Sequence, residues 1–418
     1  MNTALLIIGD EILNGDTLDT NSNFASRLLN ENGVNVSRKL TVGDSKEAIM
    51  KGLDFLLKEA DLVISTGGLG PTRDDITKYT FAEYFGSELV LNDEVYQYLI
   101  NRYAKRKAIL NDLTKSQAIV PVKAETIINP VGTAPIFWFD INNKVVVTLP
   151  GVPAEMRYLL ENIVIDRVKN RFVLDTIIHR VIQTVGVPES ALAIKLKVIE
   201  DKIENEKSAK FKLAYLPTMG SVKLRLTGIG NDEKAINIIL DSWKAEIVQA
   251  AGEFIFGYEK DSLAGSIGDL LRTKNATLST AESCTGGNIA HEITSIPGSS
   301  DYYYGGIISY DNSVKINQLG VKQQTIDTCG AVSEETAKEM LEGILKKMGT
   351  TYAIVTTGIA GPGGGTEDKP VGTVWIGVGT KDRSIIKRYQ FDRNRTENIH
   401  LFTTTALDML RRLIIGKL

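Results

Sequence analysis

The sequence has few of the residues on which many enzymes and secreted proteins depend. Among 418 residues there are only 2 cysteines and 3 histidines. Two cysteines, Cys284 and Cys329, cannot form a disulfide framework or a thiolate metal cluster. The histidines (His179, His291 and His400) fall within expected strands or helices, where ordinary packing or surface roles are the better interpretation. Catalysis is therefore expected to use carboxylates, hydroxyls, lysine or metal-bound water.

The sequence also lacks an excess of either charge. Lys and Arg number 48 and Asp and Glu number 51, which gives a net charge of -3. No basic excess exists to drive nucleic-acid binding by counterion release, so we expect no direct nucleic-acid partner. No uncharged apolar run approaches the ~20 residues that cross a bilayer. The first residues reach Asp10 and Glu11 too soon for a signal peptide. We therefore expect a cytoplasmic protein with no membrane partner.

Three segments with different patterns follow one another along the chain. Residues 1–168 alternate strand and helix signals from a buried strand at 4–8 onward, which predicts a doubly wound, mostly parallel sheet with its ligand site at the carboxyl ends of the strands. Residues 169–252 have the βαββα order of a small α+β module for spacing and association. After a connection at 252–260, the segment 253–418 alternates again. The expected fold class is α/β, with two doubly wound α/β domains joined by the small module.

The strongest local signal for chemistry is the segment 281–287, which follows an expected strand and opens a helix. A serine at such a junction, Ser283, lies beside backbone N–H groups and the positive end of a helix dipole, which can stabilise an oxyanion. Serine needs a base, and Lys315 at the next strand-to-helix junction is the candidate, because burial and the helix dipole would lower its pKa. Tyr310 would relay a proton or orient the substrate. Alternatively, Ser283 only caps a helix, Lys315 is a solvated surface residue and Tyr310 packs in the core.

Residues around this serine are candidates for substrate binding. The glycine-rich segment 357–365 follows an expected buried strand and lacks the Gly-Lys-Ser/Thr ending of a P-loop. Its backbone N–H groups could hold a phosphate or a ring, although a flexible connection is the alternative. Arg395 would supply a fixed cation for a phosphate or carboxylate. The other candidates for substrate binding are Thr285, Gly286, Gly287, Gly361 and Gly363.

A second candidate site lies in the N-terminal segment. Residues 66–75 follow the third expected strand, and their glycines allow the backbone to approach a ligand closely. Asp74 and Asp75, together with Glu11 at the end of the first strand, are candidate ligands of Mg²⁺ held between phosphates. The alternative is that the acidic pair only lies in a first helical turn, where carboxylates are favoured. The candidate ligand-binding residues of this loop are Thr66, Gly67, Gly68 and Gly70.

Several of these segments, in this order, resemble the CinA family of competence/damage-inducible proteins, and the resemblance covers essentially the whole chain. The first part resembles the MogA/MoaB-like molybdopterin-binding domain, and the last part resembles the PncC-type nicotinamide mononucleotide (NMN) deamidase domain. One departure is Ile136, where the N-terminal pattern has glycine. The matching segments are 9–13, 19–21, 66–75, 129–135 and 149–156 in the first part, and 281–287, 330–333, 358–365 and 369–374 in the last.

The resemblance implies that the C-terminal domain hydrolyses NMN to nicotinic acid mononucleotide and ammonia, without a cofactor, in pyridine-nucleotide salvage. Ser283 matches the family's nucleophile, Lys315 its base, Tyr310 its assisting tyrosine and Arg395 its C-terminal arginine. The chain is then expected to form a homodimer, as in the family.

The resemblance also implies that the N-terminal domain hydrolyses ADP-ribose to AMP and ribose 5-phosphate. A divalent metal, Mg or Co, would be required, with K assisting, and Asp74 and Asp75 match the acidic motif. Two other functions stay open. One is a regulatory binding protein of competence and DNA damage without turnover, although the charge balance disfavours direct DNA contact. The other is a molybdopterin-binding protein, since a fold by itself does not fix function.

Overall fold

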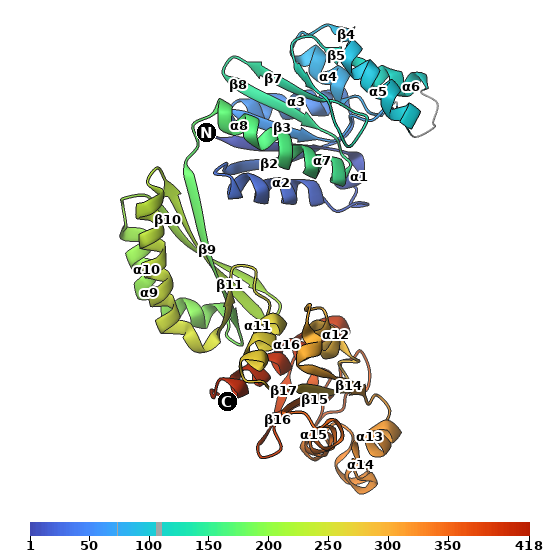
Figure 1. Ribbon diagram of the computed structural model, residues 1–418, viewed down its shortest axis with the longest axis vertical. Coiled ribbons are helices and arrows are strands. Elements are labelled where there is room, and N and C mark those ends of the chain that lie inside the picture. The colour runs from blue at the N-terminus through green and yellow to red at the C-terminus, as the bar shows by residue number, and fades with distance from the viewer. Residues whose placement is uncertain (73, 106–110) are drawn as a thin grey trace. The chain divides into compact units, whose positions relative to one another are not determined.

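The computed structural model describes residues 1–72, 74–105 and 111–418. The chain divides into two compact units, the first formed by 1–178 with 229–233 and the second by 179–228 with 234–418. The first unit is an N-terminal α/β domain, and the second contains a small module and a C-terminal α/β domain (Figure 1). None of the helices in the described part of the chain combines the length and the apolar sequence that a membrane span needs.

The N-terminal domain is a six-stranded sheet in the order β2-β1-β3-β8-β7-β6. The first four of these strands are parallel, and β7 runs antiparallel to both its neighbours. A separate two-stranded ribbon joins β4 to β5. The strands are β1 (Thr3–Ile8), β2 (Val36–Val42), β3 (Leu62–Thr66), β4 (Leu89–Leu91), β5 (Ile119–Pro121), β6 (Glu125–Ile127), β7 (Ile136–Ile141) and β8 (Lys144–Leu149). The helices are α1 (Asp10–Leu13), α2 (Thr20–Glu31), α3 (Lys46–Leu57), α4 (Thr77–Tyr84), α5 (Asp93–Lys105), α6 (Asp112–Lys115), α7 (Pro153–Leu159) and α8 (Ile165–Arg171).

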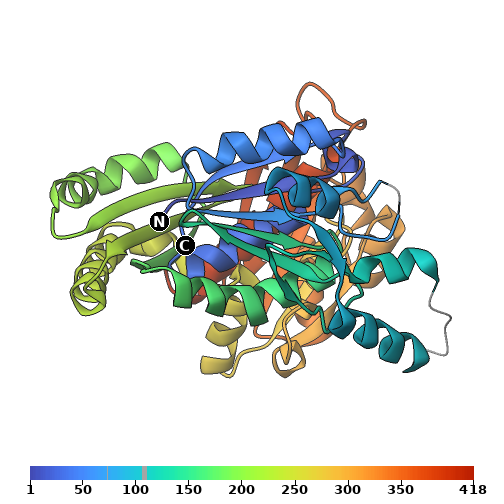
Figure 2. The same ribbon diagram turned by 90° about the horizontal axis from the view of Figure 1, so that it is seen from above.

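Helices cover both faces of this sheet, which is why β1 is apolar at nearly every position (Figure 2). Successive side chains of a strand point to opposite faces. Leu5 and Ile7 therefore pack with α2, α7 and α8, whereas Leu6 and Ile8 pack with α3 and α4. Ile136, at the start of β7, is fully buried in the first of these two clusters.

The small module is a four-stranded sheet in the order β10-β11-β9-β12 with two long helices. The expected βαββα order is present. The segment 252–260, expected to be only a connection, contains a further strand that pairs antiparallel with β9 and so belongs to the module's sheet. The elements are β9 (Thr176–Val185), α9 (Glu189–Asn205), β10 (Lys210–Thr218), β11 (Ser221–Gly230), α10 (Glu233–Ala251) and β12 (Ile255–Tyr258).

The C-terminal domain is a five-stranded sheet in the order β14-β13-β15-β16-β17. The first three strands are parallel, and the last two form an antiparallel edge. The strands are β13 (Leu278–Glu282), β14 (Tyr303–Ile308), β15 (Tyr352–Gly358), β16 (Thr373–Gly379) and β17 (Ser384–Gln390). The helices are α11 (Leu263–Thr273), α12 (Asn288–Thr294), α13 (Asn312–Leu319), α14 (Gln323–Cys329), α15 (Glu334–Met348) and α16 (Arg395–Ile414).

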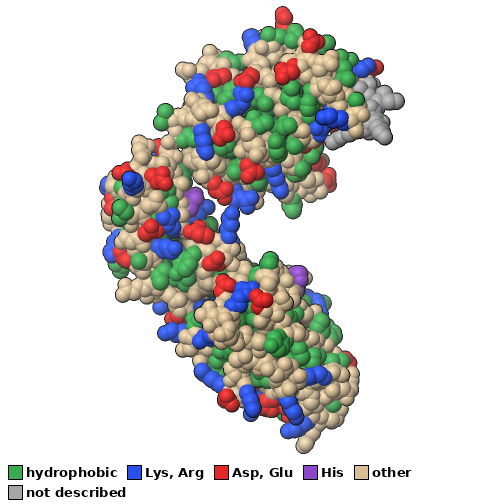
Figure 3. Space-filling model, in the orientation of Figure 1, with side chains coloured by type: hydrophobic (Ala, Val, Ile, Leu, Met, Phe, Trp, Pro, Cys, Tyr) green, Lys and Arg blue, Asp and Glu red, His purple; other side chains and the backbone are tan. Residues whose placement is uncertain are grey.

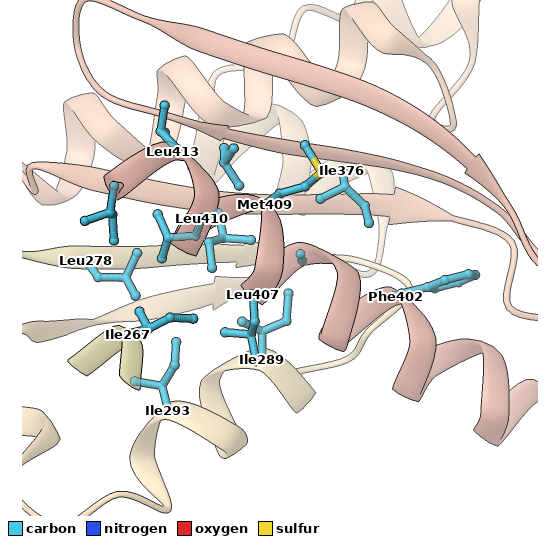
Figure 4. Close-up of a cluster of buried hydrophobic side chains, with 14 of the residues drawn as sticks. Ile267, Leu278, Ile289, Ile293, Ile376, Phe402, Leu407, Met409, Leu410 and Leu413 are labelled. Atoms are coloured by element: carbon cyan, nitrogen blue, oxygen red, sulfur yellow. The ribbon is translucent and has the colours of Figure 1, made fainter. Parts of the chain in front are cut away.

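The core of this domain also has two layers. Figure 4 shows Ile267 of α11, Ile289 and Ile293 of α12, and Leu407 and Leu410 of α16 packed together against one face of the sheet. Helix α15 covers the other face, together with the end of α13. The expected α/β class is therefore confirmed. An antiparallel edge, which the sequence pattern did not predict, completes each of the two larger sheets.

Candidate active site

The segments with the strongest sequence signals follow neighbouring parallel strands of the C-terminal sheet. Ser283 follows β13, Tyr310 follows β14 and the glycine-rich loop follows β15. Because these strands are parallel and adjacent, their carboxyl ends meet at one edge. A cavity of about 270 Å³ opens there, lined among others by Ser283, Tyr310, Lys315, Gly361, Gly363 and Arg395.

The structure brings Ser283 and Lys315 together inside this edge. The Lys315 Nζ lies 3.1 Å from the Ser283 Oγ, and the two residues are only 1% and 8% exposed. Lys315 lies in the first turn of α13, whose N-cap is Asp311. The Ser283 N–H donates to the Thr356 carbonyl of β15 at 3.0 Å, which fixes the start of the turn. The alternative of a solvated surface lysine is therefore wrong.

The surroundings of Lys315 favour its neutral form. Burial lowers the pKa of its amine below the ordinary value of 10.5, against the opposing effect of Cys284 and Asp311. Burial also raises the pKa of the Cys284 thiol to about 12, so at neutral pH this thiol carries no charge that would hold a proton on the lysine. Nζ lies 2.8 Å from the Ser309 carbonyl and 3.3 Å from the Tyr310 carbonyl. A neutral amine can donate to these two carbonyls and accept from the Ser283 hydroxyl through its lone pair.

Tyr310 and Arg395 form the outer wall of the cavity. Tyr310 is 60% exposed, so the alternative of a core tyrosine is wrong. Arg395, the first residue of α16, donates from Nη2 to the Tyr310 hydroxyl at 3.0 Å and from Nη1 to the Gly361 carbonyl at 2.7 Å. A guanidinium has five N–H groups, so Arg395 keeps donors for an anionic ligand while it links the glycine-rich loop to Tyr310.

Three predicted substrate-binding residues have a different role, because they hold the turn itself. Thr285, Gly286 and Gly287 are not among the residues that line the cavity. The Thr285 hydroxyl and the Gly287 N–H donate to the Glu282 carboxylate at 2.8 and 3.0 Å, and the Gly286 N–H donates to the Ser283 carbonyl at 3.1 Å. Two further N–H groups of α12 also donate to Glu282.

The first N–H groups of α12 are therefore occupied, and the expectation that they hold an oxyanion is wrong. Sequence reasoning missed Glu282. Its only signal was an acidic residue at the end of a buried strand, directly before the serine.

The predicted N-terminal residues line a second cavity, of about 460 Å³, at the carboxyl ends of β1 and β3. Ile136 does not line it, so the departure from the family pattern lies in the core rather than in the site. Arg73, inside the acidic loop, lies outside the described residues. The cavity is lined by all the residues predicted for this site: Glu11, Thr66, Gly67, Gly68, Gly70, Asp74 and Asp75.

The three acidic residues do not fit a preformed metal site. Within the described ranges, no group of three or more His, Cys, Asp or Glu side chains could hold a metal ion. The Asp75 carboxylate turns back to accept from the Thr72 N–H and hydroxyl. A hydrogen bond from Thr72 also lowers the pKa of Asp74. Glu11, Asp74 and Asp75 therefore line the cavity without forming a ligand group of their own, and a divalent metal held there between phosphates stays a prediction.

Comparison with known proteins assigns all three parts of the chain. Residues 4–170 match a probable molybdopterin binding domain, residues 179–257 the damage-inducible protein CinA KH domain, and residues 260–414 the CinA C-terminal domain. The chain is 41% identical to a CinA-like protein of Cytophaga hutchinsonii and 42% identical to one of Flavobacterium psychrophilum, over 99% of each chain in both cases. The chain belongs to the CinA family.

Among solved CinA structures, a competence/damage-inducible protein of Agrobacterium tumefaciens is 40% identical. It matches 36% of this chain and 93% of its own, with a TM-score of 0.36. The expectation of a CinA protein with a MogA/MoaB-like N-terminal domain is confirmed.

The CinA KH segment lacks a feature by which KH domains bind nucleic acid. KH domains clamp a nucleic-acid backbone with a Gly-x-x-Gly loop. The segment 179–257 contains no Gly-x-x-Gly tetrapeptide. Basic and acidic side chains are also interspersed over the face seen in Figure 3. The absence of a direct nucleic-acid partner stays a prediction, and both observations agree with it.

Proposed function

We propose that the C-terminal domain is an amidohydrolase that converts NMN to nicotinic acid mononucleotide and ammonia by a Ser/Lys mechanism. One observation supports this most directly: the amine of Lys315 lies 3.1 Å from the hydroxyl of Ser283, beside the cavity and buried. Burial lowers the pKa of this amine below its ordinary value, which favours a role as a base. A serine needs such a base to become a nucleophile.

The reaction follows from this pair. Lys315 takes the Ser283 proton as Oγ attacks the carboxamide carbon, and the carbonyl oxygen becomes an oxyanion. Lys315 then gives the proton to the departing nitrogen, so ammonia leaves and an ester to Ser283 remains. A water molecule gives a proton to Lys315 and attacks this ester. The product acid leaves as the proton returns to Oγ.

The oxyanion needs donors other than the start of α12, because Glu282 takes those N–H groups. Cys284 follows the nucleophile and lines the cavity, and its backbone N–H donates to no other residue in the described part of the chain. We assign the oxyanion to this N–H, since a preorganised donor beside the attacked carbonyl stabilises the transition state. Arg395 and the glycine-rich loop would receive the phosphate of the nucleotide.

The direct test is release of ammonia from NMN by the purified full chain, with the second product identified by mass spectrometry. Ser283→Ala should abolish turnover. Ser295→Ala is the matched control, because it removes an exposed serine hydroxyl at the other end of α12, away from the cavity. Absence of ammonia from the wild-type protein, or full activity of Ser283→Ala, would end this assignment. If the wild-type chain releases no ammonia, a competence protein without turnover is favoured; if Ser283→Ala is fully active, the chain is an amidase with another nucleophile.

A second activity is proposed for the N-terminal domain, namely cleavage of ADP-ribose to AMP and ribose 5-phosphate. The cavity of about 460 Å³ at the strand ends, lined by every residue predicted for this site, supports it. Among the described residues, the three carboxylates form no group that could hold a metal ion by itself.

AMP release should be measured with and without a chelator. Loss on chelation would support the metal dependence that the family resemblance implies, and unchanged NMN cleavage in the same sample is the control. Tight pterin binding with no ADP-ribose cleavage would contradict the proposal.

A further inference from the structure

Glu282 is a carboxylate buried directly beside the nucleophile. It is the last residue of β13 and is only 1% exposed. Its Oε2 accepts from the Thr285 hydroxyl at 2.8 Å and from the Gly287 and Ile289 N–H groups at 3.0 Å each. Its Oε1 accepts from the Ala290 N–H at 2.9 Å. Four donors on one carboxylate are enough to compensate its burial, because buried charges need hydrogen-bonded partners.

These contacts explain how the turn 283–287 holds its shape. The first N–H groups of any helix lack partners within the helix, and a negative charge is favoured there. The Glu282 side chain supplies both an acceptor and a charge to α12, from the residue just before the turn. Gly286 and Gly287 have φ values of 61° and 96°, so the chain between Glu282 and α12 reverses through two left-handed residues. The carboxylate thus joins the two ends of the turn that carries Ser283.

The backbone of Glu282 reaches the lysine as well. Its carbonyl accepts from the Ser309 N–H at 2.7 Å, where β13 lies beside β14. The Ser309 carbonyl in turn accepts from the Lys315 Nζ at 2.8 Å. Ser309 is fully buried, so no water competes for these contacts. Glu282 therefore directly precedes the nucleophile in the chain. Its carbonyl also binds Ser309, whose own carbonyl orients the base.

We propose that Glu282 is a positioning residue of the Ser/Lys pair. Its carboxylate fixes the turn that presents the Ser283 hydroxyl, and its carbonyl fixes the acceptor that orients the Lys315 amine. This inference rests on the proposed function of the C-terminal domain. Glu282 itself touches no substrate, because it does not line the cavity and its oxygens are occupied by the turn and by α12.

The substitution Glu282→Gln tests this role while it keeps the size of the side chain. The amide places its NH₂ group against N–H donors that need an acceptor, so the turn shifts. A misplacement of about 1 Å at a reacting group costs about 10²-fold in rate. We expect kcat for NMN to fall by about that factor with KM nearly unchanged, since the ligand-binding residues lie on other segments.

Two other variants separate positioning from a general loss of structure. Ser262→Ala removes the N-cap of α11 in the same domain, where the Ser262 hydroxyl accepts from the Gly265 N–H at 3.1 Å. It should lower the melting temperature and leave kcat unchanged. If Glu282→Gln does not fold, Thr285→Val removes only one donor to the carboxylate, and kcat should fall severalfold.

An unchanged kcat in a folded Glu282→Gln, or an equal loss of kcat in Ser262→Ala, would overturn the proposal. A rise in KM at constant kcat would also overturn it.

Labelling of Ser283 by phenylmethanesulfonyl fluoride, followed by intact mass, separates this proposal from the function on which it rests. If the wild-type chain does not cleave NMN, the proposed function fails. The labelling rate still reports how well the Ser283 hydroxyl is presented to its base. We expect slower labelling in Glu282→Gln than in the wild-type chain and in Ser262→Ala. Equal labelling rates in all three would contradict the positioning role.

Discussion

Replacing Lys315 with methionine removes the amine and keeps an unbranched side chain of similar length in a site that is 1% exposed. Because Nζ lies 3.1 Å from the Ser283 Oγ, the serine loses its base. A positioned general base contributes about 10²- to 10⁴-fold to a rate. A loss of about 10³-fold in kcat corresponds to about 4 kcal/mol of transition-state stabilisation, at 1.36 kcal/mol per factor of ten. Binding of NMN should change little, since Arg395 and the glycine-rich loop, which we propose to receive its phosphate, keep their positions.

Lys315→Arg distinguishes a base from a positive charge. An arginine stays protonated in proteins and has no lone pair to offer, so this variant should be as inactive as Lys315→Met. The wild-type profile gives a second test. Burial lowers the pKa of Lys315 below 10.5, so kcat should rise with pH through that lowered pKa as the amine loses its proton, and fall as pH drops.

Ammonia release across a pH series measures these effects, with thermal unfolding to show that each variant is folded. Activity within tenfold of wild type in either variant would refute the role of Lys315. A rate that falls as the pH rises would refute it as well.

Three further predictions follow from particular contacts. Tyr310→Phe removes the hydroxyl that accepts from Arg395 at 3.0 Å, and the loss of one hydrogen bond should lower kcat/KM for NMN about tenfold; an unchanged value would exclude Tyr310 from the site. Asp408→Ala removes the carboxylate that lies 2.7 Å from the buried Arg411 guanidinium, and it should lower the free energy of unfolding by about 3–5 kcal/mol in a denaturant titration. A loss below about 1 kcal/mol would show that Arg411 finds another partner. Gly343→Ala inside α15 would normally stabilise a helix, but here the added Cβ would overlap a carbonyl oxygen of α13, so the free energy of unfolding should fall by about 1–3 kcal/mol. A rise in melting temperature would contradict this packing.

Local patterns were sufficient to predict the elements that carry the site. Ser45 and the apolar spacing after it have the pattern of a capped helix, and α3 begins directly after Ser45, because capping and periodicity are set by neighbouring residues. In the same way, each strand-to-helix junction predicts that Ser283, Tyr310 and the glycine-rich loop come at strand ends. The strand order was not predictable locally, and neither was the antiparallel edge of each larger sheet, since pairing depends on residues far apart in sequence.

The partners of each polar group could not be read from the sequence either. Thr285 and Gly287 have the residue types of a ligand-binding turn, yet their donors meet Glu282. Asp75 has the residue type of a metal ligand, yet it accepts from Thr72. In both cases a neighbour in the same segment takes the hydrogen bond, and only the tertiary structure shows which acceptor each donor reaches.

The α/β class, the order of the three segments and the residue types available for chemistry follow from composition and periodicity, which are properties of the chain alone. Because the chain has only three histidines, the sequence also indicates lysine as the candidate base. The contact between Lys315 and Ser283, which are 32 residues apart in the chain, and the burial of the lysine amine depend on the three-dimensional packing of the domain. The loss of water around that amine lowers its pKa, and this requires the packing of several elements that no local pattern specifies.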